Sequence, residues 1–316
     1  MFERAVTTDK SARPPGVLDH LADGMSLLLI APWLIVLPIL VDIYLLVGPG
    51  IASLPLSLGM AGWIGDLDGR NAADLSLWLS ERGSWDVSRL LAFLLPSVVD
   101  GLPQNAQYEP IDRSMSTVSS ATVALLVGSF LLVGSFLFAG FLTWLAATAD
   151  LLRSKPVSYV RFVFIRWLKL LGFAAVIATG LGAIAALIVL PGILLSGEGA
   201  GSETVLGVLS LVGLGALVVT MFVPEAVIID GAGPIQAIRS SATVVFRSFW
   251  ASAALFVVSF MISPGLLSVW EEIANRPLGL GIAIVLNAAL VTSLSLASLA
   301  FYRSRIDIAR PATRSV

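Results

Sequence analysis

The chain has 316 residues, of which 57% are hydrophobic and only 13% are charged, and its mean hydropathy is +0.93. Because a soluble domain carries about 25% charged residues, this composition predicts an integral membrane protein, and the net charge of −2 argues against a nucleic-acid partner. The absence of cysteine excludes disulfides, thiol nucleophiles and cysteine-ligated clusters.

Six apolar runs are long enough to cross a bilayer, whose core of about 30 Å requires ~20 helical residues. They predict an all-α, polytopic membrane protein with spans at 24–47, 118–147, 168–195, 204–228, 249–269 and 278–301. The first run is too long for a cleaved signal peptide, so we expect it to remain as a span.

The basic residues predict the orientation of these spans. Of the 19 lysines and arginines, 14 lie in the two terminal tails and in the loops after the second and fourth spans. By the positive-inside rule both termini are therefore expected to be cytoplasmic. The resulting organisation is a cytoplasmic tail (1–23), a first hairpin with an extracytoplasmic loop at 48–117 (24–147), two further units (148–228 and 229–302) and a basic cytoplasmic tail (303–316).

The outer loop at 48–117 is acidic, with eight carboxylates against four arginines. Its stretch from 74 to 103 is typical of two short amphipathic helices separated by Gly83. This loop either caps the bundle or offers a docking surface to a partner.

Two cytoplasmic segments resemble each other, and each leads into a span. One runs from Pro156 to Arg161 and the other from Pro234 to Arg239, with apolar residues at matching positions. Proline suits the first position of a helix, so we expect interfacial helices, here called elbows, before the third and fifth spans. A degenerate third copy, with Pro15 and Val17, precedes the first span, and the repeat therefore has two or three copies.

The stretch VPEAVIIDGAGPIQAIRSSATVVFRSFW, from Val223 to Trp250, resembles the membrane domain of bacterial glycerophosphoryl diester phosphodiesterases, which also occurs in stand-alone membrane proteins of unknown function. The elements that carry the resemblance are a span-ending proline, an acidic residue, a glycine turn, an Ala-x-Arg-Ser helix and an aromatic pair. The resemblance implies a bacterial cytoplasmic-membrane protein. We expect no phosphodiesterase activity, since the spans leave no room for the soluble catalytic barrel.

Three polar residues interrupt the apolar runs and are candidate intramembrane sites: Asp42, Glu225 and Asn287. An ionisable residue within a membrane span is a functional hypothesis by default. The alternatives are that Asp42 reaches the outer interface or pairs with an arginine of the outer loop, and that Glu225 pairs with Arg239 or Arg247 or is hydrated at the interface. For Asn287 the alternative is that it joins neighbouring helices.

A second set of residues is suited to lipid headgroups. A glycine turn that opens a helix presents free N–H groups to an anion, and arginines near the inner face add positive charge. The candidate headgroup contacts are Gly231, Gly233, Arg239, Arg247 and Arg161.

No motif for a nucleotide, a metal or covalent catalysis is present, and the one histidine is His20. We therefore expect neither cofactor nor metal, and a membrane enzyme ranks last. The sequence favours a non-enzymatic accessory or scaffold subunit that contacts lipids and a protein partner, or forms a homo-oligomer. The alternative is a transporter that handles lipids or small solutes.

Overall fold

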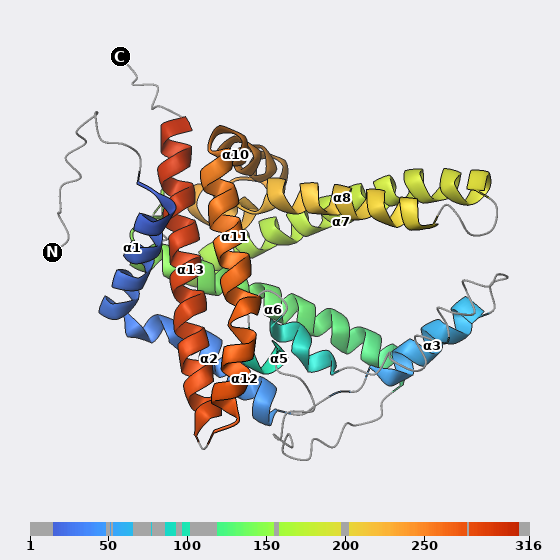
Figure 1. Cartoon of the computed structure of the whole chain (residues 1–316), viewed down its shortest axis with the longest axis horizontal. Coiled ribbons are helices and arrows are strands. Elements are labelled where there is room, and N and C mark those ends of the chain that lie inside the picture. Colours follow the sequence, from blue (N-terminus) through green and yellow to red (C-terminus); the bar gives the residue numbers. More distant parts are fainter. Residues whose placement is uncertain are drawn as a thin grey trace.

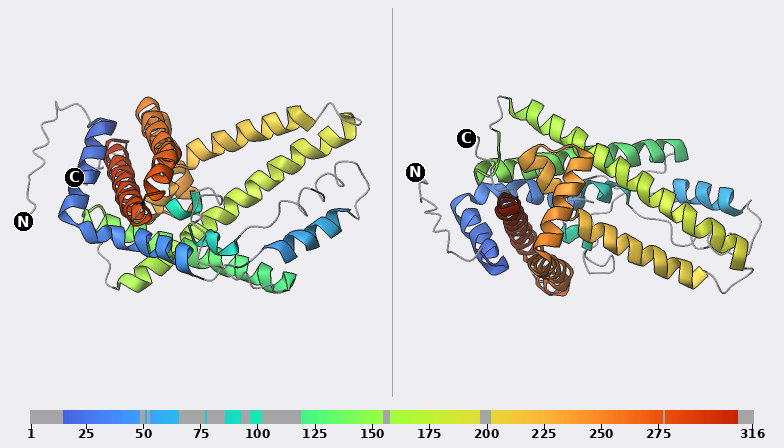
Figure 2. Two further views of the ribbon diagram at one scale, coloured as in Figure 1. Left: turned by 60° about the horizontal axis from the view of Figure 1, so that its bottom comes forward. Right: turned by 90° about the horizontal axis from the view of Figure 1, so that it is seen from above.

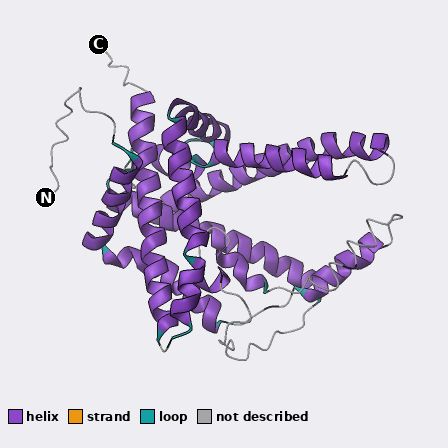
Figure 3. Cartoon of the chain, in the orientation of Figure 1, coloured by secondary structure: helices purple, strands orange, loops and turns teal. Residues whose placement is uncertain are grey.

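The computed structural model describes residues 15–48, 51, 53–65, 77, 86–92, 97–101, 119–154, 158–196, 202–276 and 278–309. All regular elements in these ranges are helices, and none is a β-strand (Figure 3). Four helical stretches are long and apolar enough to cross a membrane, or up to six if each of two bent pairs counts as one span. The predicted all-α, polytopic membrane fold is confirmed.

The predicted first span is broken. Helix α1 (Val17–Ile30) meets η1 (Pro32–Ile35) and α2 (Val36–Val47) at a bend of 101°. Pro32 explains the break, because proline lacks an N–H and pushes the preceding residue out of the helical region. Ala31 accordingly has φ −126° and ψ 63°. The segment expected to be a third elbow is thus a helix, which also takes up part of the predicted span 24–47.

The described parts of the outer loop are helical; the first of them packs on the Ser120 end of α6 and points away from the bundle, and the other two lie against the bundle or α6 (Figure 1). They are α3 (Leu54–Gly65), η2 (Val87–Ala92) and α5 (Val98–Gly101). Helix η2 packs on α6, and α5 packs against α2, α12 and α13. These contacts agree with a cap over the bundle. The first predicted amphipathic helix, before Gly83, lies outside the described residues except for Leu77.

The middle of the chain forms long helices that extend away from the bundle. They are α6 (Ser120–Thr148), α7 (Tyr159–Ser196) and α8 (Ser202–Thr220), and the α7–α8 hairpin projects furthest (Figures 1 and 2). Helix α7 runs through its 38 residues as one element. The elbow predicted before the third span is therefore not a separate helix, since the basic segment continues directly into the span. Pro156 lies outside the described residues.

The last part of the chain contains the elbow predicted before the fifth span. After α9 (Val223–Glu225) and the π-helix η3 (Ala226–Asp230), helix α10 (Pro234–Arg247) meets α11 (Phe249–Gly265) at a bend of 102°. Helices α12 (Leu267–Ala274) and α13 (Gly279–Ala309) complete the bundle.

Helix α13 is the central packing element. It contacts α1, α2, α6, α10 and α12, and its residues Phe301 and Tyr302 are fully buried. Phe301 stacks on Phe222 with ring centroids 5.5 Å apart. Close approach of α1 requires Gly24, because a Cβ there would lie 2.5 Å from the Ser293 carbonyl oxygen. The core therefore surrounds α13, near the segment that carries the polar candidates.

Candidate functional site

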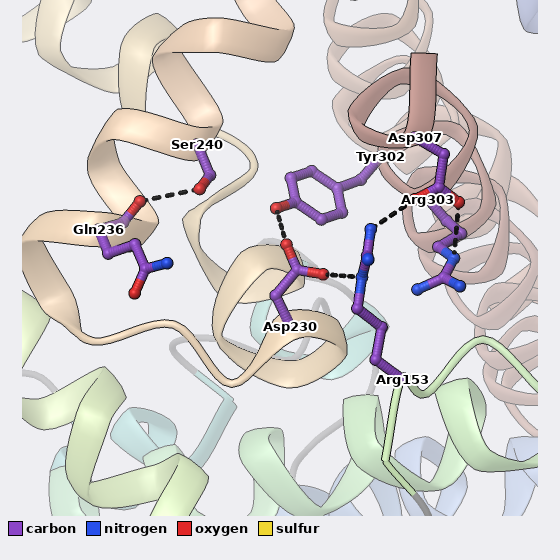
Figure 4. A network of polar contacts seen from close by, with 7 residues as sticks. All are labelled: Arg153, Asp230, Gln236, Ser240, Tyr302, Arg303 and Asp307. Carbon is purple, nitrogen blue, oxygen red and sulfur yellow. Dashed lines mark hydrogen bonds and ion pairs between the residues drawn. The ribbon is translucent and has the colours of Figure 1, made fainter. Parts of the chain in front are cut away.

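Asp230, the last residue of η3, is the centre of a polar network at one end of the bundle (Figure 4). The Tyr302 hydroxyl donates to Asp230 Oδ2 over 2.8 Å, and Arg153 Nε lies 2.5 Å from Oδ1. The Asp230 side chain is 7% exposed, whereas that of Arg153 is 40% exposed. A buried carboxylate is thus compensated by one cation and one hydroxyl, as a buried charge requires.

Arg153 extends this network to the end of α13. It also pairs with Asp307, and Arg303 Nε lies 3.0 Å from Asp307 Oδ2 (Figure 4). The Arg153 backbone N–H donates to the Ile229 carbonyl over 3.4 Å. We call these five residues, Arg153, Asp230, Tyr302, Arg303 and Asp307, the Asp230 network. It joins the segment after α6 to η3 and to α13.

Gly231 ends η3 in the left-handed region, with φ 67° and ψ 26°. Its N–H donates to the Val227 carbonyl over 3.1 Å, and the Ala232 N–H donates to the Ala226 carbonyl over 3.4 Å. These bonds form the glycine cap common at helix C-termini. The N–H groups of Gly231 and Ala232 therefore bond to carbonyls of the preceding helix, and not to the anion that the sequence suggested for this turn.

Two basic side chains of α7 lie against this glycine turn. Lys169 Nζ donates to the Gly231 carbonyl over 2.5 Å. Arg166 is buried at 6% exposure, with its guanidinium carbon 4.6 Å from the centroid of the Phe162 ring. A Cβ at position 231 would lie 1.8 Å from Arg166 Nη1. The glycine is thus required both by its φ and by the arginine.

The three arginines predicted to contact headgroups are exposed. Arg239 and Arg247 lie on α10, and Arg161 lies in the first turn of α7. Arg247 Nη1 donates to the Ala309 carbonyl over 2.8 Å. Gly233 is the N-cap residue of α10. Gly231 therefore contacts Arg166 and Lys169, while the predicted arginines are spread over the surface of two helices.

Glu225 is buried, and it contacts α13 instead of the arginines of the elbow. It is 7% exposed, and the Ser298 hydroxyl donates to its Oε1 over 2.6 Å. Its other oxygen, Oε2, is buried without a hydrogen bond to the described part of the chain. It lies directly before the π-helix, an uncommon conformation that is frequent at functional sites.

The other two intramembrane candidates are also buried. Asp42 on α2 is 2% exposed and accepts a hydrogen bond from Ser97. Asn287 on α13 is 7% exposed. It precedes Ser298 by 11 residues, which corresponds to ~16 Å along a helix. The structure therefore places Asn287 well away from Glu225 instead of gathering the candidates into one site.

Several residues of this region were missed as site residues by sequence reasoning. Arg153, Arg166 and Lys169 contributed only to the charge asymmetry, and Tyr302 gave no signal. One signal was available: Arg303 and Asp307 are four residues apart on a helix, a spacing typical of an ion pair. The contacts between distant helices had no counterpart in local sequence.

No group of three or more His, Cys, Asp or Glu side chains that would suit a metal ion occurs within the described ranges. A scan against family models and searches of curated proteins and of solved structures find no match to this chain. The resemblance to the phosphodiesterase membrane domain stays a prediction.

Proposed function

We propose that this protein is a non-enzymatic accessory or scaffold subunit of the bacterial cytoplasmic membrane, which holds partner membrane proteins through its projecting α7–α8 hairpin. The observation that supports this proposal is the uncovered state of the hairpin. In the most apolar 18-residue stretch of α7, only 11% of the residues are buried within the chain. A span that gains so little from its own fold is available for packing against another helix.

The small residues of the hairpin support this proposal. At glycines 180 and 182 in α7 and 207, 213 and 215 in α8, an added Cβ would have nothing within 4 Å. Glycine inside a helix costs about 1 kcal/mol relative to alanine, and small residues four positions apart allow membrane helices to approach closely. Ala174, Ala178 and Gly182 have this spacing. The face of α7 that carries these three small residues is therefore suited to close packing against a partner helix.

The test uses the natural absence of cysteine. A single cysteine placed at the exposed Ala178 would be labelled with benzophenone maleimide and photo-cross-linked in native membranes, since this group inserts into C–H bonds of any neighbouring chain, and the product would be identified by mass spectrometry. We expect one product of fixed mass, either a dimer of this chain or a complex with one membrane protein. Adding Gly182→Leu should abolish it, whereas Gly128→Leu on α6, another open position, should not.

A product that forms equally with Gly182→Leu would overturn the proposal, and so would a monomer under all conditions.

The same single-cysteine series also tests the orientation. A cysteine at exposed Arg239 should be labelled by a membrane-impermeant maleimide only after lysis if α10 is cytoplasmic.

A second candidate function is supported by one observation: Oε2 of Glu225 is buried and has no hydrogen-bond partner among the residues that the structure describes. A carboxyl oxygen in this state can accept a proton or a solute donor, as in a transporter of lipids or small solutes. Flux measured in proteoliposomes should then be lost in Glu225→Gln and retained in Glu271→Gln. Flux that is absent, or equal in both variants, would exclude this candidate.

A further inference from the structure

The buried residues of the described part of the chain include one arginine or lysine, Arg166. It makes no hydrogen bond or ion pair to another described residue, and its one close contact is the face of Phe162. Among the other described arginines, Arg161 and Arg239 are exposed, whereas Arg247 and Arg303 each have an acceptor. A guanidinium carries five N–H donors, so Arg166 has donors that can bind a ligand.

Lys169 lies three residues further along α7, on the same helical face. Its ammonium is fixed by the Gly231 carbonyl, and it is close enough to Arg166 for their charges to repel. Two cations are thus held side by side at one edge of the glycine turn. Such an arrangement is costly unless an anion is present.

The nearest acid does not provide this anion. Asp230 attracts Arg166 electrostatically, but its carboxylate oxygens already contact Tyr302 and Arg153. Arg153 is paired with both Asp230 and Asp307. Among the described residues, no carboxylate forms an ion pair with Arg166 or Lys169, so these two cations keep their positive charge uncompensated. The guanidinium packs directly on Gly231, because a Cβ there would lie 1.8 Å from Arg166 Nη1.

We propose that Arg166 and Lys169 form a binding site for a phosphate group. A guanidinium pairs with two phosphate oxygens at once, and an ammonium adds a point charge. The pair lies within the first three turns of α7, the end of the helix that carries its basic residues, where the headgroup of an anionic phospholipid or a free phosphate from the cytoplasm would arrive. This site does not depend on the scaffold function proposed above.

The experiment uses the full chain in nanodiscs of phosphatidylcholine that contain a minor fraction of phosphatidylglycerol. Retained lipids are counted by native mass spectrometry after release into detergent. Arg166→Gln and Lys169→Gln should each lower phosphatidylglycerol retention at least tenfold. The matched control is Arg239→Gln, which removes an exposed charge from α10 and should leave retention unchanged.

Lys169 is partly exposed, so Lys169→Gln keeps the test valid if Arg166→Gln fails to fold. A second arm titrates the lipid-free chain with inorganic phosphate by calorimetry. If the variants of Arg166 and Lys169 lower lipid retention and the chain does not bind inorganic phosphate, the bound phosphate group belongs to a lipid headgroup. If the same variants lower the binding of inorganic phosphate, the ligand is a free phosphate. Equal losses in all three variants, or no loss in either arm, would overturn the proposal.

Discussion

The hydroxyl of Tyr302 donates to Asp230 Oδ2 over 2.8 Å, although the two residues are 72 positions apart in the chain. Tyr302 is fully buried on α13, and Asp230 ends the π-helix that follows the fourth span. This bond holds the C-terminal end of η3 against α13.

The first prediction concerns this bond. Tyr302→Phe keeps the ring and removes the donor, so it should lower the free energy of unfolding by about 1–2 kcal/mol. Thermal unfolding in mild detergent measures the loss. The matched variant is Tyr44→Phe on α2, which should change stability by less than about 0.5 kcal/mol. Equal effects of the two changes would show that the bond contributes nothing.

The second prediction concerns the ion pair. Asp230→Asn should destabilise the protein by about 2 kcal/mol, because Arg153 loses one of its two charged partners and an amide offers Arg153 and Tyr302 one acceptor oxygen in place of two. This value is below that of a fully buried pair, since the Arg153 side chain is 40% exposed. Glu272→Gln breaks the pair with Arg276, in which both side chains are more than 70% exposed, and should cost about 0–1 kcal/mol. A double-mutant cycle of Asp230→Asn with Arg153→Gln would show no coupling if the pair were irrelevant.

The third prediction concerns Gly231. Gly231→Ala adds a Cβ at φ 67° that overlaps Arg166, so the left-handed strain of about 1–2 kcal/mol is joined by displacement of the guanidinium. We expect a lower yield of folded protein and a lower melting temperature. Gly180→Ala adds a Cβ in open space and should stabilise α7 by up to about 1 kcal/mol. A melting temperature that is the same in both variants would contradict the role of the glycine turn.

The fourth prediction concerns Glu225. Ser298→Ala removes the donor to Oε1 and leaves a buried carboxyl without its hydrogen bond, which should cost about 1–3 kcal/mol. Glu225→Gln in the same background should restore part of this loss, because it removes the ionisable group. Ser129→Ala is the control, since this exposed serine bonds only its own helix. Additive effects of the two changes would mean that the residues do not interact.

The membrane fold was predictable because apolar runs of about 20 residues are a direct consequence of bilayer thickness. The elbow at Pro234 was predictable for a similar reason, since its turn chemistry is local. The bend at Pro32 was missed although the proline was visible, because the apolar composition of 24–47 continues through it. The absence of an elbow before α7 could not be anticipated from a repeat whose match is limited to the six residues from Pro156 to Arg161.

The polar sites were less predictable, because their partners come from distant helices. Glu225 was predicted as a candidate intramembrane residue, with Arg239 or Arg247 as alternative partners, where the structure has Ser298. Local spacing predicts contacts within a helix, as for Arg303 and Asp307. It does not show which face of α13 meets η3, since packing of long apolar helices determines that choice.

The central place of α13 has a consequence for biogenesis. Membrane proteins are inserted from the N-terminus as they are translated, and α13 is the last helix to emerge. Until then α1 lacks the helix against which it packs, and Asp230 has Arg153 but not Tyr302. Helix α1 and the π-helix therefore gain these contacts only after α13 has been synthesised, so the packing of this bundle is completed with α13 and not hairpin by hairpin.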